Sequence, residues 1–370
     1  MKKKFAAILL TASLFLSGCA SILEQEYLYV SPHSSTLLDA SDPSVLRAES
    51  YQELVNALVY FISAGTETGR VRLYLDSGQI EAELEQACLE VIQEDPLGAY
   101  AVDYIKYSVT PLVAYSEAEV QITYRRTREQ VSAIVSATGT PAIRSELESV
   151  LSEYAPGCTL RIGYFDQDED YIHSLVRQAY LSIPDKAMEF PRASVSIYPD
   201  SGRQRIVEIT LDYHLDTEEL LSRQTQLLEA KQQLISPLLL STSEPDGSDL
   251  AALLLESCTY DQDGGSTAYH ALVQHRANAE GLTLAQLSLS KSLSLPCYPV
   301  SGSIADTPNF WTIIETASGW RHLVFSLHSS NDSADPDSFP LFTDDELLEA
   351  GYIWDTSLVP SCTDFSEESL

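Results

Sequence analysis

The chain has 370 residues, of which 22 are lysine or arginine and 54 are aspartate or glutamate, so its formal net charge is −32. A chain this acidic repels nucleic acid and anionic lipid head groups, and we expect no nucleic acid among its partners. The acidic residues are spread along the sequence, which indicates solvated faces more than one cation-binding site.

The N-terminus has the layout of a secretion signal. Residues 2–4 are lysines, a short apolar run follows them, and the sequence LSGC occupies positions 16–19. The apolar run is too short for a stable membrane span in the finished protein. The pattern resembles the signal peptide of bacterial lipoproteins, which implies that residues 1–18 are removed and that Cys19 carries the lipid. An ordinary cleaved signal peptide is the alternative.

Lipid attachment at Cys19 would hold the mature chain on the outer side of the cytoplasmic membrane. Two acyl chains bury enough methylene groups for durable anchoring, where one chain would be marginal. Residues 19–45 are rich in serine, aspartate and proline and lack periodicity, so we expect a flexible tether. Five cysteines follow Cys19, and an odd number cannot all pair within one chain. Their spacing does not fix a disulfide pattern.

Residues 46–150 predict a small α+β layer. Ser50 is a typical N-cap for the amphipathic segment that ends at Gly65. Further patterns follow in the order strand, helix, strand, strand, at residues 71–75, 80–92, 101–114 and 119–125. A small sheet covered on one face by helices fits this order.

The same order returns in residues 151–240. Strand, helix, strand and strand patterns occur at residues 160–164, 170–181, 194–199 and 205–213. Val71 corresponds to Leu160 and Ile122 to Ile209, so the period is close to 88 residues. We infer an internal duplication. The many tyrosines of both copies suit half-buried strand positions, and a binding face is the alternative.

Residues 241–370 carry the most specific pattern, after a linker at 241–249. Residues 268–325 resemble the core of the transglutaminase-like superfamily, which shares the papain-like cysteine protease fold. The positions that fit are Ala268, Tyr269, Ala271, Leu272, Glu280, Gly281, Leu295, Pro296, Cys297, Val300, Gly302, Trp311, Gly319 and Trp320. The resemblance implies a helix at about 279–294 packed on an antiparallel sheet, although the alternation of Leu and Ser from residue 287 on is typical of a strand. The whole chain is thus predicted to be α+β, with two small α/β-sheet repeats followed by a transglutaminase-like domain.

The three residues that perform the chemistry of this family are replaced. The resemblance puts Ala279 at the nucleophile position, Asn309 at the base and Val324 at the acid that orients the base. The chemistry needs a thiolate at a helix N-terminus, an imidazole that shuttles a proton and a carboxylate that fixes its tautomer. None of the three side chains supplies these groups. We therefore expect a degenerate, non-catalytic site.

A cleft shaped for an extended peptide keeps its walls when the thiol is lost. By resemblance, Glu280, Gly281, Trp311 and Trp320 would line or support this cleft. The leading hypothesis is a membrane-anchored binding or structural module, with a peptide or protein as the candidate ligand and no cofactor. The alternative is an active cysteine-dependent peptidase or transglutaminase that acts on peptides or cell-wall stems.

Two other residues are candidates for the missing groups. Cys297 lies in an apolar run, which predicts a core strand and not a helix start. His322 is likewise expected on a strand, either satisfied by a partner or exposed. The sequence contains no HExxH motif and no CxxC pair, so we expect no metal site.

Overall fold

The computed structural model describes residues 37–39, 42–75, 78–328 and 341–363. The predicted signal, Cys19 and most of the predicted tether at 19–45 lie outside these residues. The tether prediction was wrong for its described end, because Leu37–Asp39 and Asp42–Ala48 are paired strands of a sheet. The chain is α+β and forms two compact units. The first holds the described residues up to Ile134 together with Arg161–Phe165 and Tyr198–Ile206, and the second holds Val135–Leu160, Asp166–Ile197 and the described residues from Val207 on.

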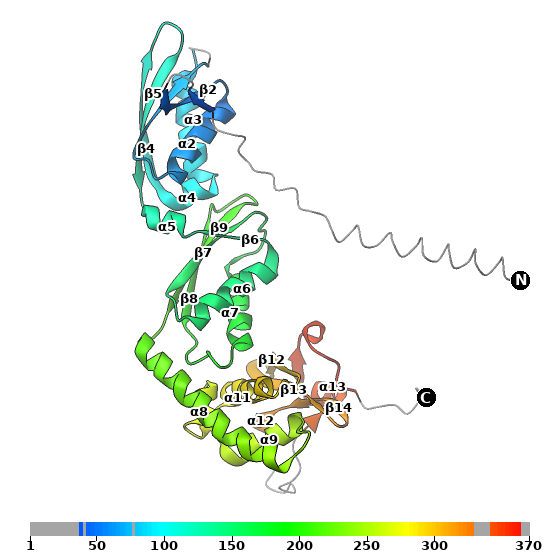
Figure 1. Ribbon diagram of the computed structural model, residues 1–370. Helices are drawn as coiled ribbons and strands as arrows, with labels where there is room; N and C mark the ends of the chain where they lie inside the picture. The colour runs from blue at the N-terminus through cyan, green and yellow to red at the C-terminus, as the bar shows by residue number, and fades with distance from the viewer. Residues whose placement is uncertain (1–36, 40–41, 76–77, 329–340, 364–370) are drawn as a thin grey trace, which may run out of the picture. The chain divides into compact units, whose positions relative to one another are not determined.

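The first repeat builds one mixed sheet with helices on it (Figure 1). The strand order is β1-β2-β3-β5-β4, in which β2 and β3 are parallel and the other pairs are antiparallel. In chain order the elements are β1 (Leu37–Asp39), β2 (Asp42–Ala48), α2 (Tyr51–Ser63), β3 (Thr68–Leu73), α3 (Ile80–Gln93), α4 (Pro96–Ala101), β4 (Val102–Pro111), β5 (Ser116–Tyr124) and α5 (Arg128–Ser132).

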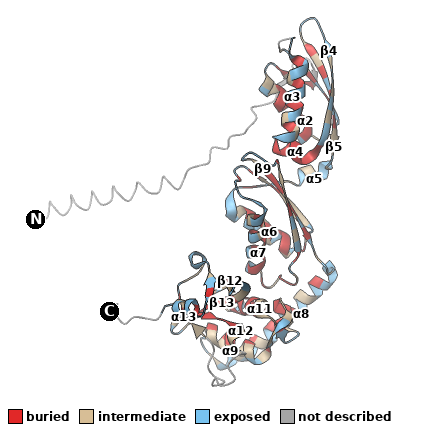
Figure 2. Ribbon diagram, turned by 180° about the vertical axis from the view of Figure 1, so that it is seen from behind, coloured by how far each residue is buried: buried red, intermediate tan, exposed pale blue. Residues whose placement is uncertain are grey.

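Local sequence explains these elements. The hydroxyl of Ser50 accepts from the N–H of Glu53 and begins α2, as predicted. Alternate residues of β5 are buried, so one face of the sheet meets the helices. Leu54 of α2, Leu84 of α3 and Val120 of β5 are fully buried in one core (Figure 2). Helix and sheet therefore share a single apolar layer.

The second repeat has the same topology as the first. Its elements are β6 (Val135–Ala137), α6 (Gly139–Ser152), β7 (Gly157–Ile162), α7 (Glu169–Ser182), β8 (Arg192–Tyr198) and β9 (Arg205–Asp212). Its strand order β6-β7-β9-β8 matches β2-β3-β5-β4 element for element, which supports the inferred duplication.

The predicted boundary between the repeats at residue 150 falls inside α6, because the second copy already begins at β6. The start of this copy leaves a weak sequence signal. β6 is three residues long and largely exposed, and the N-cap of α6, Thr138, makes no side-chain capping bond. The structure therefore places the boundary near Ile134, where the first continuous segment of the first compact unit ends.

The C-terminal part packs helices on an antiparallel sheet of order β15-β14-β13-β12-β16. Its helices are α8 (Thr217–Ser241), α9 (Gly247–Ser257), α10 (Ala268–Leu272), α11 (Ala279–Ser292), α12 (Phe325–His328), α13 (Asp344–Glu349) and the 3-10 turn η1 (Thr356–Leu358). Its strands are β10 (Thr259–Gly265), β11 (Arg276–Ala277), β12 (Cys297–Ile304), β13 (Thr307–Thr316), β14 (Gly319–Leu323), β15 (Leu341–Phe342) and β16 (Tyr352–Trp354). The predicted linker at 241–249 shortens to the residues between α8 and α9.

The segment whose period suggested a strand is the helix α11, as the family resemblance implied. Every residue from Gly281 to Ser290 is buried. Contacts with α9, α10, β12 and β13 surround the helix, so both its leucines and its serines face protein. A helix buried on all sides has no polar face, and its sequence therefore lacks the helical period.

None of the helices in the described part of the chain is both long and apolar enough to cross a bilayer. The longest, α8, carries charged residues along its length.

Replacement of Gly98 by alanine should destabilise the first repeat. A β-carbon at this position in α4 would overlap the carbonyl oxygen of Val91, so backbone must shift. We expect a loss of about 1–3 kcal/mol, typical of overpacking, measured as the free energy of unfolding in urea. Gly163→Ala is the control, because a β-carbon there meets no atom within 4 Å. Equal stability of the two variants would contradict the packing at Gly98.

Candidate functional site

The N-terminus of α11 holds Ala279, which the sequence resemblance matched to the nucleophile position. Asn278 caps the helix, and its side-chain oxygen accepts from the N–H of Gly281 at 3.0 Å. Ala279 is the first helical residue and offers only a methyl group. A β-carbon at Gly281 would lie 2.5 Å from the carbonyl oxygen of Gly265, so this position requires glycine. The first turn of α11 thus combines an Asn cap with an obligatory glycine, and Ala279 adds no nucleophile to it.

Glu280, next to Ala279, forms a partly buried ion pair. Its carboxylate lies 2.8 Å from the guanidinium of Arg177 on α7. Burial raises the pKa of Glu280, and Arg177 offsets part of this effect. The guanidinium also lies over the rings of Phe190 and Phe310, at 4.6 and 4.5 Å. The second repeat therefore docks at the N-terminal end of α11.

Asn309 and Val324 lie on one face of the sheet. Asn309 of β13 pairs with Gly302, and its side-chain oxygen accepts from the N–H of Phe310 at 2.8 Å. Val324 directly follows β14 and is buried against a cluster that includes Trp311. Because side chains alternate along a strand, Asn309 shares the face of Trp311.

Cys297 marks the other face. This residue begins β12, as predicted for a strand, and pairs with Ile314. Burial raises the pKa of its thiol to about 12, with the hydroxyls of Ser290 on α11 and Thr312 on β13 as hydrogen-bonding neighbours. α11 therefore contacts the face of Thr312 and not that of Asn309. Asn309 and Val324 thus lie on the sheet face away from α11, and this register does not support their predicted convergence with Ala279.

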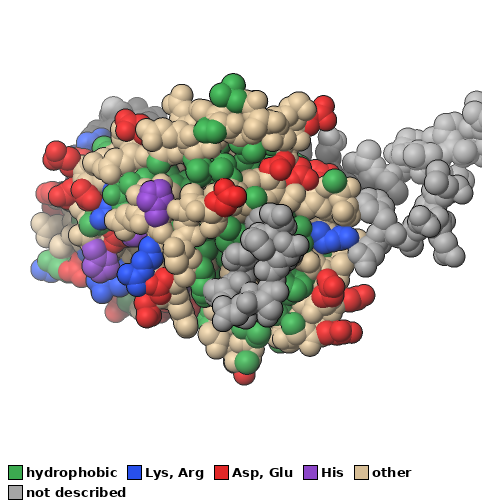
Figure 3. Space-filling view, turned by 90° about the horizontal axis from the view of Figure 1, so that it is seen from below, with side chains coloured by type: hydrophobic (Ala, Val, Ile, Leu, Met, Phe, Trp, Pro, Cys, Tyr) green, Lys and Arg blue, Asp and Glu red, His purple; other side chains and the backbone are tan. Residues whose placement is uncertain are grey.

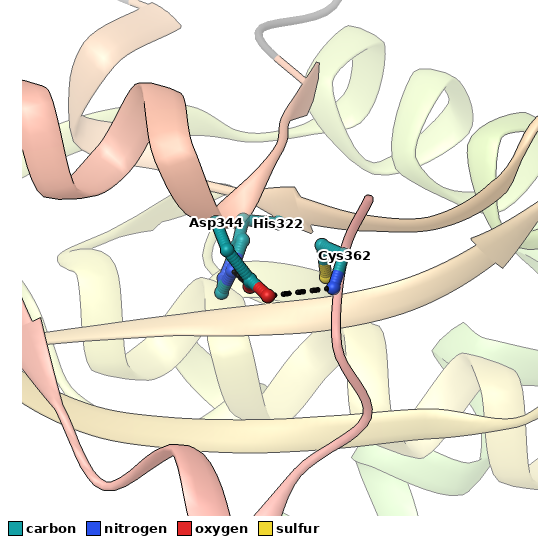
Figure 4. Close-up of side chains that lie close together, drawn as sticks. All are labelled: His322, Asp344 and Cys362. Carbon is teal, nitrogen blue, oxygen red and sulfur yellow. Dashed lines mark hydrogen bonds and ion pairs between the residues drawn. The ribbon is translucent and has the colours of Figure 1, made fainter. Parts of the chain in front are cut away.

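The face of Trp311 carries a polar network, of which Figure 4 shows His322, Asp344 and Cys362. The indole N–H of Trp311 donates to Nδ1 of His322 at 2.9 Å, and Nε2 of His322 donates to Asp344 at 2.8 Å. His322 is completely buried, so the predicted strand histidine is the satisfied kind. Because Trp311 can only donate, the neutral imidazole carries its proton on Nε2.

Asp344 ties the C-terminal segment to this network. Its second oxygen accepts from the backbone N–H of Cys362 at 3.0 Å and from the hydroxyl of Ser361 at 2.7 Å. Its own N–H donates to the carbonyl of Cys362 at 2.8 Å. Partial burial alone would raise the pKa of Asp344, but the hydrogen bonds from His322, Ser361 and Cys362 outweigh it and lower the pKa.

His322, Asp344 and Cys362 include the residue types of a cysteine triad and of a metal site. Their donor atoms all lie within 4.8 Å of one another. Both imidazole nitrogens are nevertheless engaged, and burial raises the pKa of Cys362 to about 12. A metal on Nε2 would need the proton on Nδ1, where it would face the Trp311 N–H. The network is therefore built to hold the tail and does not fit a metal or a nucleophile.

The two cleft tryptophans have different surroundings. Trp311 is fully buried, so it supports the sheet and lines no open surface. Trp320 is partly exposed, and its ring centroid lies 5.4 Å from that of Tyr298. Asp344 is the residue that sequence reasoning missed. The one sequence feature that could have pointed to Asp344 is the segment from residue 339 to 362, which resembles the closing segment of the family.

Known structures give only partial likenesses. One is a crystal structure of a transglutaminase, with 11% sequence identity and a TM-score of 0.24 over 45% of this chain and 50% of that chain. Another is a provisionally assigned protease from Parabacteroides distasonis, with 7% identity and a TM-score of 0.21 over 70% of this chain and 40% of that one. The chain thus spans half or less of the length of these proteins. No protein-family profile and no curated protein sequence matches it.

Acidification should destabilise the protein through His322. Burial lowers the pKa of His322 below the usual 6.5 and Asp344 raises it only in part, so the folded state binds fewer protons than the unfolded chain. This contribution to stability is complete above about pH 6.5 and is lost as the pH falls through the folded pKa. We expect the free energy of unfolding in urea to drop between pH 7.5 and 5.5.

His322→Gln should lower stability by about 1–3 kcal/mol at pH 7.5, since it leaves buried partners unpaired. The drop on acidification should also be smaller than in the wild type. His214→Gln is the control, because the His214 side chain is 86% exposed beside Glu189, and this variant should keep the full drop. An unchanged drop in His322→Gln would refute the role assigned to the buried imidazole.

Proposed function

We propose that the protein is a lipid-anchored extracytoplasmic module whose transglutaminase-like domain is non-catalytic and serves binding and structure. The observation that carries this proposal is Ala279 at the first position of α11, where the family places its thiolate. The neighbouring Glu280 is held by Arg177 of the second repeat. The site is thereby occupied by the chain's own packing.

The other thiols support the absence of cysteine catalysis. A thiol becomes nucleophilic when its pKa is lowered by a cation, an imidazole or a helix N-terminus. Among the described residues, burial instead raises the pKa of every cysteine, to about 11 for Cys258 and about 12 for Cys88, Cys158, Cys297 and Cys362. The active-enzyme alternative would have to use one of these thiols.

The contacts of the second repeat support a structural role. One oxygen of Asp185 accepts from Lys231 of α8 at 2.6 Å and from Ser288 of α11 at 2.5 Å. Lys231 is buried, so the loss of its partner would leave an uncompensated charge. Together with the Arg177–Glu280 pair, these bonds fix the second repeat on the central helix.

The proposed membrane attachment rests on the sequence LSGC at positions 16–19, which resembles the lipid-attachment motif of bacterial lipoproteins. The net charge of −32 keeps the folded part soluble and gives it no attraction to anionic lipid head groups. A lipid-linked N-terminus followed by a tether would hold the repeats and the C-terminal domain near the bilayer without insertion.

The protein should show no thiol-dependent acyl transfer. Incorporation of monodansylcadaverine into a glutamine-bearing peptide and hydrolysis of that peptide should both stay at the level without protein. Iodoacetamide should label Cys297 slowly in the folded protein, because its thiol stays protonated. Labelling is measured by mass spectrometry of the folded and the urea-unfolded chain.

A turnover that disappears in parallel with fast alkylation of Cys297 would establish the rival enzyme. Cys158→Ser is the matched control for loss of a thiol. Cys158 is another partly exposed cysteine but lies outside the transglutaminase-like domain, so any turnover should be the same in this variant as in the wild type. Ala279→Cys alone should restore no activity, because a new thiol needs a base and an orienting acid.

Replacement of Cys19 by serine should abolish membrane attachment. Without the thiol neither acyl chain can be added, so the protein should appear in the soluble fraction or remain as an uncleaved precursor. Fractionation with immunodetection and the mass of the N-terminal peptide measure this outcome. Cys158→Ser should stay in the membrane fraction. A processed, membrane-bound Cys19→Ser protein would rule out the lipid anchor.

A further inference from the structure

The second unit contains an open cleft of about 940 Å³. We call it the α7–α11 cleft and define it by Arg144, Leu181, Leu287, Lys291, Tyr298 and Leu358, which lie on its walls. One wall comes from α6 and α7 of the second repeat, and the other comes from the C-terminal half of α11, from β12 and from η1. The volume falls within the range of small-ligand sites, roughly 300–1,000 Å³.

The end of the cleft at Lys291 lies apart from Ala279 at the start of α11. Ala279 and Lys291 are separated by three turns of the helix, about 18 Å at 1.5 Å per residue. A ligand held at Lys291 therefore needs no contact with Ala279, and such a site is additional to the proposed function.

The charge of the cleft differs from that of the chain. The walls carry three basic side chains, Arg144, Arg177 and Lys291, and one acidic side chain, Asp355. Acidic residues outnumber basic ones 54 to 22 in the whole chain. On the face in Figure 3 the acidic side chains are scattered and are not gathered in one patch. A local excess of cations in such a protein favours an anionic ligand.

Two of the three cations remain available to a ligand. Arg177 is taken by Glu280 at 2.8 Å. Arg144 pairs with Glu148 along its own helix at 3.7 Å, and an exposed pair of this kind contributes only about 0.3–0.5 kcal/mol. Lys291 is exposed in the last turn of α11, where the helix dipole offsets about half a charge.

The one carboxylate on the walls is already engaged. An oxygen of Asp355 accepts from both the N–H and the hydroxyl of Ser357, at 2.9 and 2.6 Å. These two bonds lower the pKa of Asp355 and fix it as the cap of η1. Arg144 and Lys291 thus face one cleft from opposite walls, and an outside carboxylate would satisfy both.

The rest of the lining is apolar with interspersed hydroxyls. Leu181 and Leu287 contribute from the two walls, Pro296 and Pro299 flank Cys297, and serines lie between them. A simple anion would leave this apolar surface in contact with water. A peptide brings apolar side chains for the walls, backbone groups for the hydroxyls and carboxylates for the cations.

We propose that the α7–α11 cleft binds a short acidic peptide. Its carboxylates bridge Arg144 and Lys291, and its apolar side chains lie on Leu181 and Leu287. The ligand is recognised by charge and by apolar contact together, and the binding weakens with salt because the two cations are partly exposed.

The test is fluorescence anisotropy of a labelled Gly-Leu-Glu-Leu-Glu peptide with the full mature chain in detergent micelles. Lys291→Glu and Arg144→Glu should each weaken binding about tenfold or more. Lys106→Glu is the control with the same charge change on an exposed lysine of the first unit, and its affinity should stay within about twofold of wild type. Circular dichroism checks that all three variants remain folded.

Two further arms separate the alternatives. The peptide Gly-Leu-Gln-Leu-Gln should bind at least tenfold more weakly, and a Gly-Leu-Lys-Leu-Lys peptide should bind Lys291→Glu better than it binds wild type. Failure of the glutamate peptide to bind, equal binding of the glutamine peptide, or equal loss in Lys106→Glu would overturn the proposal. Displacement of the peptide by glutarate at equal concentration would overturn the proposal too, since the site would then bind a simple dianion without apolar contacts. None of these outcomes depends on catalysis or on Cys19.

Discussion

The burial of the middle of α11 is the constraint on which the second unit depends. Ten successive residues, Gly281 to Ser290, are buried, so the polar ones among them gain from partners in neighbouring protein. Ser288 finds Asp185, and Gln286 donates to the carbonyl of Gly247 at 3.1 Å. Because Asp185 belongs to the second repeat, the central helix is complete only when that repeat is docked. The N-terminal and C-terminal halves of this unit therefore stabilise one another.

The start of α11 is likewise held by the second repeat. Arg177 lies there with its charge on Glu280 and its flat face on Phe310. The buried imidazole of His322 is likewise used to fasten the tail and not to move protons.

Elements with a strong one-sided pattern could be predicted from the sequence, and those set by distant partners could not. Helices α3 and α7 lie where their periodicity indicated, because each has one apolar face. The short strand β6 escaped notice, since three mostly exposed residues carry no period. The bond from Asp344 to His322 spans 22 residues of chain, and the pair of Arg177 with Glu280 spans still more. Local sequence patterns cannot predict contacts between residues so far apart in the chain.

The five described thiols have a consequence for the chemical reactivity of the chain. None of them forms a disulfide, and burial holds each one protonated. These thiols therefore offer little thiolate to small electrophiles or to mixed disulfide exchange, and the cohesion of the described residues comes from packing and hydrogen bonds.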